Sequence, residues 1–587
     1  MKTKWNLTLL YKFPTDPRIE RDIAEIKNAY EQFAKKYRNK TDYLKNEKGL
    51  LRVLTDYEKL IAKVGGGKPL AYFEYSRTLD STDQKMVSRC NQLHDQLTMA
   101  SNKILFFELS LGKIEKRLQK KFLHSKKLIR YRYFLQRTFE NGEYDLTEQE
   151  EQILKLKNLP SHSLWKSGFS RFLNKQTVRF RDKNLPISEA MNKVATLPTE
   201  ARRKLSGQIM DTFYAVSDFA GSEINAIYID KKINDELRGF RQPYSATILR
   251  YENDQKSILN LVEIVTNNFY ISRRFYKLKA KLLDLKHLEY GDEAVSIGKT
   301  RKKIEFKKEF NVLQEVFYGA DKKYGVILDE MIKNGQIDVF PKTGKAGGAF
   351  CSGGVSLPTF VLLNHTGNFR SIMTFAHEMG HAIHKERSKQ QSSIYQNATA
   401  SVGETASKFF ETLVFNAIFE TLSDREKIIA LHDKIQWDIS SVFKQVACFN
   451  FELELHRRIR ETGSLPKEDI ALLMNKHMKA YLGPVFKLKE QDGYFFVAWP
   501  HIRNFFYVYS YAYGQLISKA LHEKYRADAQ YIKQIDQFLS AGGSKSPKNI
   551  FKEIGVDTTG PNFFKAGLES IKDDIIYLEN IAKRMKI

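Results

Sequence analysis

The sequence predicts a mainly α-helical protein that contains a small β-sheet. Two observations support this fold class. Apolar residues recur at steps of three and four along most of the chain, which is typical of amphipathic helices. The pattern changes between residues 337 and 364, where two short β-prone runs, 337–340 and 360–363, flank a glycine-rich loop at 344–354. We therefore expect helices before and after this segment and a small sheet within it.

Several elements are marked by residues that commonly begin or end them. Asp16 followed by proline predicts a helix start, and the apolar residues as far as Tyr37 then follow the helical period. Thr147 and Glu150 form the pattern of a capping box ahead of a further helix. Residues 178–181 alternate apolar and basic side chains before a turn, so a short strand is expected there.

The chain length of 587 residues exceeds what one hydrophobic core usually supports, so we expect two or more subdomains. A boundary near residues 195–205 would divide an N-terminal helical domain, residues 1–200, from a second domain, residues 201–587. Helices are expected to resume at about Asn368, after the small sheet, and to continue to the end of the chain.

The chain is strongly basic, with 95 Lys and Arg against 69 Asp and Glu and a formal net charge of +26. The basic residues are spread along the sequence, which favours a solvated, lysine-rich surface. We therefore expect no nucleic-acid partner. A non-enzymatic basic helical protein that binds nucleic acid is the alternative from another functional class.

Cysteine content and hydropathy indicate the compartment. Cys90, Cys351 and Cys448 are far apart and odd in number, so a disulfide framework is not expected and a reducing cytosol fits. The N-terminal residues lack the apolar run and cleavage site of a signal peptide. The most apolar stretches are too short or are broken by charged residues. We expect a cytoplasmic protein with no membrane partner.

Residues 377–381, His-Glu-Met-Gly-His, match the motif HExxH. On a helix, His377 and His381 lie on one face, so both imidazoles can bind one metal ion while Glu378 reaches a water held by that ion. A helix through the motif is supported by apolar residues at steps of three and four, namely Ile372, Phe375, Ala376, Met379 and Ile383.

A catalytic zinc ion needs a third protein ligand and one position open to water. His384, Glu386 and Glu404 are candidates after the motif. Glu386 would point elsewhere if it lies on the same helix. The chain between His377 and Glu404 is long enough for a turn and a second helix, so Glu404 is better placed. Glu411 would share a face of that second helix with Glu404 and could accept the N–H of a ligating histidine.

Two imidazoles and one carboxylate suit one Zn²⁺ ion per chain. The ion would polarise a peptide carbonyl and acidify a bound water, and Glu378 would move the proton of that water to the leaving amine. This chemistry is peptide hydrolysis without a covalent intermediate.

The charged intermediate of such a reaction needs hydrogen-bond donors besides the metal. Residues 499–514 contain His501 and several tyrosines that could supply them. The loop at Gly347, Gly348 and Ala349 carries little side-chain bulk, so a substrate backbone could approach it closely.

Several segments of the sequence resemble the M3 family of zinc metallopeptidases, and within it the oligoendopeptidase F branch. HExxH alone occurs in many unrelated peptidases, but its combination with a glutamate on a following helix and a late His/Tyr cluster is more specific. The similarity extends over nearly the whole chain, in residues 5–11, 144–148, 337–341, 348–351, 377–384, 402–407, 501–511 and 555–557.

The resemblance implies a helical two-lobed ellipsoid with a deep substrate channel and a small β-sheet beside the zinc site. Residues 1–200 would form one channel wall, and residues 201–587 would form the catalytic domain. His377, His381 and Glu404 would be the zinc ligands. The implied substrates are short, unstructured oligopeptides. A carboxypeptidase or a dipeptide-releasing enzyme on the same scaffold is the alternative to an endopeptidase.

The resemblance also implies roles outside the ligand set. Glu378 would be the general base. His501 would stabilise the transition state together with one or two of the tyrosines that follow it. Tyr507, Tyr509 and Tyr511 are the candidates, and we favour Tyr509 and Tyr511.

Overall fold

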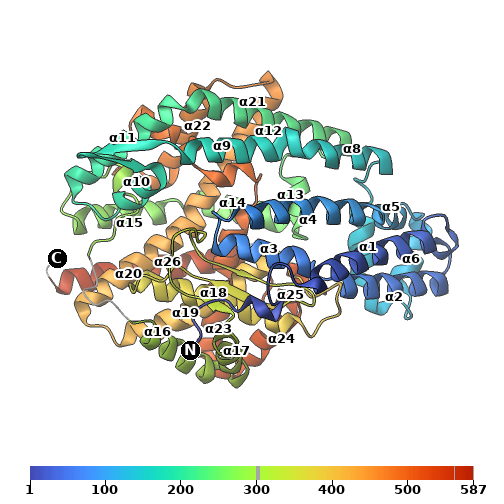
Figure 1. The fold of residues 1–587 in the computed structure, drawn as a ribbon. Coiled ribbons are helices and arrows are strands. Elements are labelled where there is room, and N and C mark those ends of the chain that lie inside the picture. The colour runs from blue at the N-terminus through green and yellow to red at the C-terminus, as the bar shows by residue number, and fades with distance from the viewer. Residues whose placement is uncertain (299–304, 561, 586–587) are drawn as a thin grey trace. The chain divides into compact units, whose positions relative to one another are not determined.

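The computed structural model describes residues 1–298, 305–560 and 562–585 (Figure 1). Helices dominate, which confirms the predicted fold class, and the strands form two small sheets. The chain divides into two compact units, each built from three separate stretches. The first unit comprises Met1–Gln152, Lys302–Glu420 and Leu521–Val556, and the second comprises Ile153–Arg301, Thr421–Ala520 and Asp557–Ile587.

These units do not follow the predicted division at residue 200. Each unit combines early and late segments of the chain, because helices late in the sequence complete a core that begins near the N-terminus or in the middle. The functions assigned to residues 1–200 and 201–587 stay predictions, as do the two-lobed shape and its channel.

The first unit begins with helices whose starts match the predicted signals. The side chain of Asp16 accepts a hydrogen bond from the backbone N–H of Arg18 and so caps the first helix. Thr147 and Glu150 form the predicted capping box, with each side chain accepting the backbone N–H of the other. The helices are α1 (Pro17–Tyr37), α2 (Glu47–Val64), α3 (Lys68–Leu79), α4 (Gln84–Asn102), α5 (Leu105–Gly112), α6 (Lys116–His124), α7 (Arg132–Asn141), α16 (Phe306–Ala320), α17 (Lys322–Asn334), α18 (Phe369–Ser388), α19 (Ala400–Glu420), α24 (Ile532–Ser540) and α25 (Pro547–Glu553).

The second unit contains the predicted strand near residues 178–181. This strand is β1 (Thr177–Phe180), which pairs antiparallel with β2 (Lys183–Pro186). The helices are α9 (Leu164–Asn174), α10 (Ile187–Val194), α11 (Thr199–Ala215), α12 (Ser217–Arg238), α13 (Ser245–Arg250), α14 (Gln255–Asn267), α15 (Tyr270–Leu282), α20 (Asp424–Ile439), α21 (Gln445–Thr462), α22 (Lys467–Leu482) and α26 (Phe563–Arg584). Two helices, α8 (Glu148–Asn158) and α23 (Tyr509–Ala527), contribute residues to both units.

The small sheet of the first unit has the strand order β3-β5-β4, with β3 (Ile337–Asp338) parallel to β5 (Phe360–Leu362) and β4 (Phe350–Ser352) antiparallel to it. The predicted runs at 337–340 and 360–363 contain β3 and β5. The predicted loop at 344–354 differs from the structure, because its residues 350–352 form β4.

Residues near the N-terminus of the chain pack against this sheet. The indole N–H of Trp5 donates to the carbonyl oxygen of Val361 at 2.8 Å, and its backbone N–H donates to Asp338 Oδ2 at 3.0 Å. The Trp5 ring packs edge-on against Phe350 and Phe360, with ring centroids 6.1 and 5.4 Å away. Phe350 therefore gains an aromatic partner by forming a strand, which no local sequence pattern indicates.

No helix in the described part of the chain is long and apolar enough to cross a membrane. Cys90, Cys351 and Cys448 are free thiols. The cytoplasmic location stays a prediction.

Trp5→Phe is expected to destabilise the protein while retaining an aromatic ring in the core. The change deletes the indole N–H and leaves the buried Val361 carbonyl without this donor, which typically costs about 1–3 kcal/mol. Urea unfolding followed by circular dichroism should show a lower midpoint than in the parent. Trp165→Phe is the control, since Trp165 is half-buried and packs against Phe219 in the second unit. Equal midpoints for Trp5→Phe and the parent would contradict this account.

Candidate metal centre

The HExxH residues lie on α18, as the apolar stripe predicts. Asn368 caps this helix, because its side chain accepts the backbone N–H of Ser371 at 2.9 Å. His377 and His381 are each 21% exposed and lie on the side of the helix that solvent can reach. The opposite side is anchored by the predicted stripe, all of it buried: Ile372, Phe375, Ala376, Met379 and Ile383.

Glu404 lies on α19, the helix that packs against α18 (Figure 1). Gly380, between the two histidines, allows the close approach of these helices. A Cβ atom at Gly380 would lie 2.6 Å from the Cα of Ser407 and 3.2 Å from the carbonyl oxygen of Ala406, both on α19. A side chain at this position would therefore force the helices apart. The sequence pattern alone did not identify this role.

The side chains of α18 and α19 converge on one point. Nε2 of His377 lies 3.7 Å from Glu404 Oε2, and Nε2 of His381 lies 3.9 Å from Glu404 Oε1. One donor atom from each of the three residues lies within 4.8 Å of the others. Across the described residues, this is the one cluster of three or more His, Cys, Asp or Glu side chains with such spacing.

The donor set fits a zinc ion. Ligand atoms at about 2.0–2.2 Å from a tetrahedral zinc lie roughly 3.3–3.6 Å from one another. The observed separations are slightly longer, so small side-chain rotations would bring all three atoms to ligand distance. Two imidazoles and one carboxylate also leave the fourth position open, which is typical of a catalytic site.

The other two candidates for the third ligand do not join this cluster. His384 is buried, and its ring packs against Phe538 with centroids 5.7 Å apart. Glu386 forms an ion pair with Lys389 at 2.6 Å. Among the three candidates named from the sequence, Glu404 is thus the one that the fold brings to the histidines.

Glu411 contacts His377 from α19. Its Oε2 accepts a hydrogen bond from Nδ1 of His377 at 3.0 Å and another from Nζ of Lys408 at 2.8 Å. Burial by itself raises the pKa of Glu411, but Lys408 and His377 outweigh this effect and lower the pKa to about 2. Glu411 is therefore ionised at neutral pH and fixes the His377 tautomer whose Nε2 carries the lone pair.

Glu378 is 6% exposed. Burial raises the pKa of this carboxyl to about 7, although His377 opposes the shift. Burial also lowers the pKa of His381 well below its usual value, and His377 reinforces that effect. His381 is therefore neutral and can offer a lone pair. A carboxyl with a pKa near neutrality can both take up and release a proton.

The second unit contains a cluster of predicted site residues. His501 Nδ1 forms a short hydrogen bond with the hydroxyl of Tyr507, and the hydroxyl of Tyr511 lies 3.5 Å from that of Tyr507. Tyr509 is not part of this cluster. Its side chain is completely buried, and its hydroxyl accepts a hydrogen bond from Asn253 at 3.0 Å. Of the three predicted tyrosines, Tyr507 and Tyr511 therefore lie with His501, whereas Tyr509, which the sequence favours together with Tyr511, does not.

The predicted substrate loop has an exposed tip on an anchored base. Lys345, whose side chain is fully buried, forms an ion pair with Asp338 at 2.6 Å. Gly347 and Gly348 are exposed, and a Cβ atom at either position would meet no atom within 4 Å. Gly348 has a φ of 76°, which glycine adopts without strain. The loop tip is therefore open to solvent at these two glycines.

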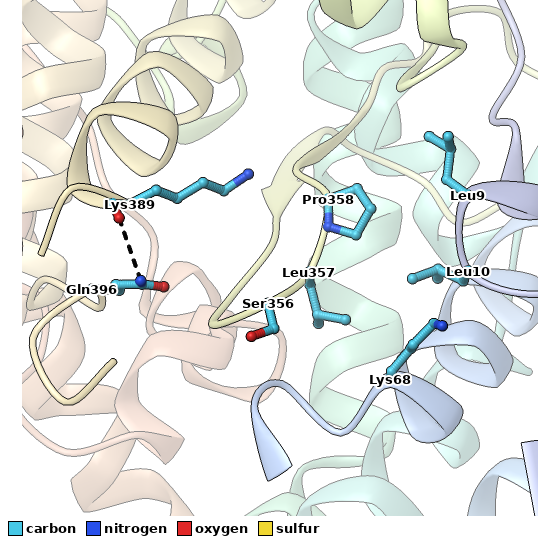
Figure 2. Close-up of a pocket in the computed structure, with 8 residues that line it drawn as sticks. All are labelled: Leu9, Leu10, Lys68, Ser356, Leu357, Pro358, Lys389 and Gln396. Carbon is cyan, nitrogen blue, oxygen red and sulfur yellow. Dashed lines mark hydrogen bonds between the residues drawn. The ribbon is translucent and has the colours of Figure 1, made fainter. Parts of the chain in front are cut away.

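A cavity of about 500 Å³ in the first unit is separate from the metal centre. Both of its lysines already lie near carboxylates, since Lys389 pairs with Glu386 at 2.6 Å and Lys68 lies 3.9 Å from Asp22. The trio of His377, His381 and Glu404 does not line it, so it is not the candidate site. Figure 2 shows residues 356–358 between Lys389 and Gln396 on one side and Leu9, Leu10 and Lys68 on the other.

Taken together, fold and site define a metallopeptidase, because two imidazoles one helical turn apart with a glutamate beside them are an arrangement these enzymes use to activate water. The chain belongs to peptidase family M3, whose model matches residues 269–570. The model of oligopeptidase F matches residues 111–172. The family that the sequence resembles is thereby confirmed, and a non-enzymatic nucleic-acid-binding role is not proposed.

Known proteins resemble the chain over nearly its whole length. The oligopeptidase PepF of Bacillus subtilis is 22% identical over 98% of this chain and 87% of its own. An oligoendopeptidase F homolog of Borreliella burgdorferi is 25% identical over 97% of this chain and 98% of its own. The crystal structure of oligoendopeptidase-F from Enterococcus faecium has the same fold, with a TM-score of 0.72 at 16% identity over 97% of this chain and 99% of that one.

Gly380→Ala is expected to weaken zinc binding. The added methyl group would push α19 away from α18 and move Glu404 from the imidazoles, which should lower zinc affinity by about tenfold or more. Elemental analysis after dialysis and competition with a chelating dye would measure the loss. Gly403→Ala is the matched control, because its Cβ would lie 3.8 Å from Nδ1 of His381, an ordinary contact. Equal zinc affinity in the two variants would show that the close approach does not control the site.

Proposed function

We propose that this protein is a zinc-dependent endopeptidase that hydrolyses short oligopeptides. The observation that supports it most is the convergence of His377, His381 and Glu404 on one solvent-accessible face, with Glu378 beside them. Membership of family M3 gives peptide hydrolysis as the reaction class. The identity of the metal, the role of each residue and the mode of cleavage belong to the proposal.

In this proposal Nε2 of His377, Nε2 of His381 and the carboxylate of Glu404 hold the zinc ion. When bound, zinc lowers the pKa of a water molecule and polarises the scissile carbonyl. The protein's own contribution is to orient these ligands. Glu411 accepts a hydrogen bond from the Nδ1–H of His377, and Lys408 keeps Glu411 ionised, so the ring presents its Nε2 lone pair to the ion.

Glu378 is the general base of the proposed reaction. It follows His377 directly on α18, and its buried carboxyl has a raised pKa of about 7. Such a group can accept a proton from the attacking water and release it to the leaving amine within one turnover. Because Glu378 transfers protons and forms no bond to the substrate, the reaction needs no covalent intermediate.

His501, Tyr507 and Tyr511 are the proposed donors to the oxyanion. Burial lowers the pKa of His501 to about 4, with Lys444 adding to the effect, so this histidine is neutral. Burial also raises the pKa of Tyr507, which keeps its hydroxyl protonated and able to donate. We leave Tyr509 out, since its fully buried hydroxyl cannot reach a substrate.

The substrates proposed are short peptides in an extended conformation. The relatives' names, oligopeptidase and oligoendopeptidase, support this size class. Gly347, Gly348 and Ala349 would lie along the substrate, where a loop tip with little side-chain bulk allows hydrogen bonds between backbones. A carboxypeptidase or dipeptide-releasing activity on the same scaffold is the alternative.

Glu378→Gln is expected to lower kcat by about a thousandfold, because the amide cannot take a proton from water. Zinc content should stay at the parental level, since Glu378 is not a ligand in the proposal. Cleavage of a quenched fluorescent nonapeptide, together with elemental analysis, would measure both quantities. Glu386→Gln is the control on the same helix and should retain parental activity. If Glu378→Gln cleaves as fast as the parent, the proposed base is wrong.

Peptides with a free or an amidated C-terminus should be cleaved at similar rates. An endopeptidase binds the chain on both sides of the scissile bond, whereas a carboxypeptidase must recognise the terminal carboxylate. Mass spectrometry of the products identifies the bonds cut. Release of one or two C-terminal residues from the free peptide alone would instead support the carboxypeptidase or dipeptide-releasing alternative.

A further inference from the structure

The segment that carries His501 and Tyr507 contains two unusual backbone conformations. After the short 3-10 helix η8 (Pro500–Arg503), Phe505 and Phe506 have φ values of 51° and 61°. The left-handed region is sterically unfavourable for residues with bulky side chains. Two such residues in succession persist only where neighbouring groups hold them, and strain of this kind is concentrated at functional sites.

The groups that hold this turn come largely from α21. The backbone N–H of Phe506 donates to Glu452 Oε2 at 2.7 Å. The ring of Phe506 stacks on His456, with centroids 5.0 Å apart and planes at 25°. Glu452 and His456 are one helical turn apart, so a single face of α21 contacts both the backbone and the side chain of Phe506. On the other side, Thr247 donates to the carbonyl oxygen of Phe505 at 2.9 Å.

The turn at Phe505 and Phe506 lies between His501 and Tyr507 in the sequence. The Tyr507 hydroxyl forms a hydrogen bond with Nδ1 of His501, and the Tyr511 hydroxyl lies 3.5 Å from the Tyr507 hydroxyl. Tyr507 follows Phe506 directly, so a change in the φ of Phe506 would redirect the chain at Tyr507. The pairing of His501 with Tyr507 therefore depends on the left-handed conformation of the turn.

Placing Glu452 here costs free energy of folding, because a carboxyl group loses its hydration when it is buried. Its side chain is completely buried, and no cation pairs with it among the residues that the structure describes. Its other hydrogen-bond partner is the weakly donating thiol of Cys448, with Sγ 3.9 Å from Oε1. Burial raises the pKa of Glu452 to about 8, although the Phe506 N–H opposes the shift. At neutral pH an uncharged carboxyl therefore accepts the Phe506 N–H.

We propose that Glu452 is a positioning residue for the His501–Tyr507 pair, acting through the backbone N–H of Phe506. The proposal rests on the role of this pair in the proposed function. Glu452 does not contact the substrate. It fixes the turn from which Tyr507 reaches His501, so that both groups are already oriented when the oxyanion forms.

The test compares Glu452→Leu with Glu452→Gln. The leucine has a similar size and no acceptor, whereas the amide oxygen of glutamine can still accept the Phe506 N–H. In Glu452→Leu, deuterium uptake by a peptide covering residues 500–510 should rise, and kcat should fall by about 100-fold, the effect of a misplacement of about 1 Å. KM and zinc content should stay at parental values. Glu452→Gln should match the parent within about threefold in kcat and show parental uptake.

Ser272→Ala is the matched control for lost stability in the second unit, because the buried Ser272 hydroxyl donates to the carbonyl of Tyr481, away from the turn. It should leave kcat and uptake in residues 500–510 unchanged. Parental uptake in Glu452→Leu would overturn the proposal. If Glu452→Leu does not fold, Glu452→Gln alone tests the proposal. A folded Glu452→Gln variant with a 100-fold loss of kcat would also overturn the proposal.

Tyr507→Phe separates this proposal from the proposed function. If Glu452 acts through Tyr507, adding Glu452→Leu to Tyr507→Phe should cause little further loss of kcat, and an equal loss in both backgrounds would refute the positioning role. If Tyr507→Phe alone has parental kcat while Glu452→Leu still raises uptake at residues 500–510, the turn is held as proposed and the catalytic role of the pair is wrong.

Discussion

The close contact between α18 and α19 at Gly380 is the constraint on which the metal centre depends. Neither helix can form the site alone, since α18 carries both imidazoles and α19 carries the carboxylate. A glutamate side chain spans the remaining gap only if the backbones approach as closely as the Gly380–Ser407 contact allows. The apolar stripe on α18 sets the rotation of that helix, and Glu411 then orients the ring of His377 from the same partner helix.

Buried polar groups likewise fix the backbone around the cluster of His501, Tyr507 and Tyr511. Arg503, which is 4% exposed, forms a bidentate ion pair with the completely buried Glu223 and donates to the carbonyl oxygens of residues 496, 497 and 499. Glu452 accepts the Phe506 N–H a few residues later. Directional bonds of this kind specify one backbone path where apolar packing would tolerate several. The ion pair and the hydrogen bonds that stabilise this segment therefore also determine its backbone conformation.

Local sequence patterns predicted what depends on local structure. The cap at Asp16, the box at Thr147 and the rotation of α18 follow from a few neighbouring residues. The choice among the tyrosines depends on a local feature that periodicity does not describe. Tyr507 lies in the turn just before α23 and Tyr511 lies in the first turn of that helix, whereas the side chain of Tyr509, the first residue of α23, enters the core. Because the helix begins only at Tyr509, the helical period alone does not relate Tyr507 to the other two. The roles of Gly380 and of the Phe505–Phe506 turn could not be predicted, because they depend on backbones distant in sequence.

The hydrogen bond from Trp5 to Val361 has a consequence for biosynthesis. Translation is vectorial, so the fifth residue leaves the ribosome long before its partner strand has been made, and the last stretch of the same unit, Leu521–Val556, arrives later still. Part of the apolar surface of the nascent N-terminal helices therefore stays uncovered until residues 521–556 have been synthesised. Such a topology favours late, cooperative completion over stepwise folding, and it gives chaperones a long interval in which to bind.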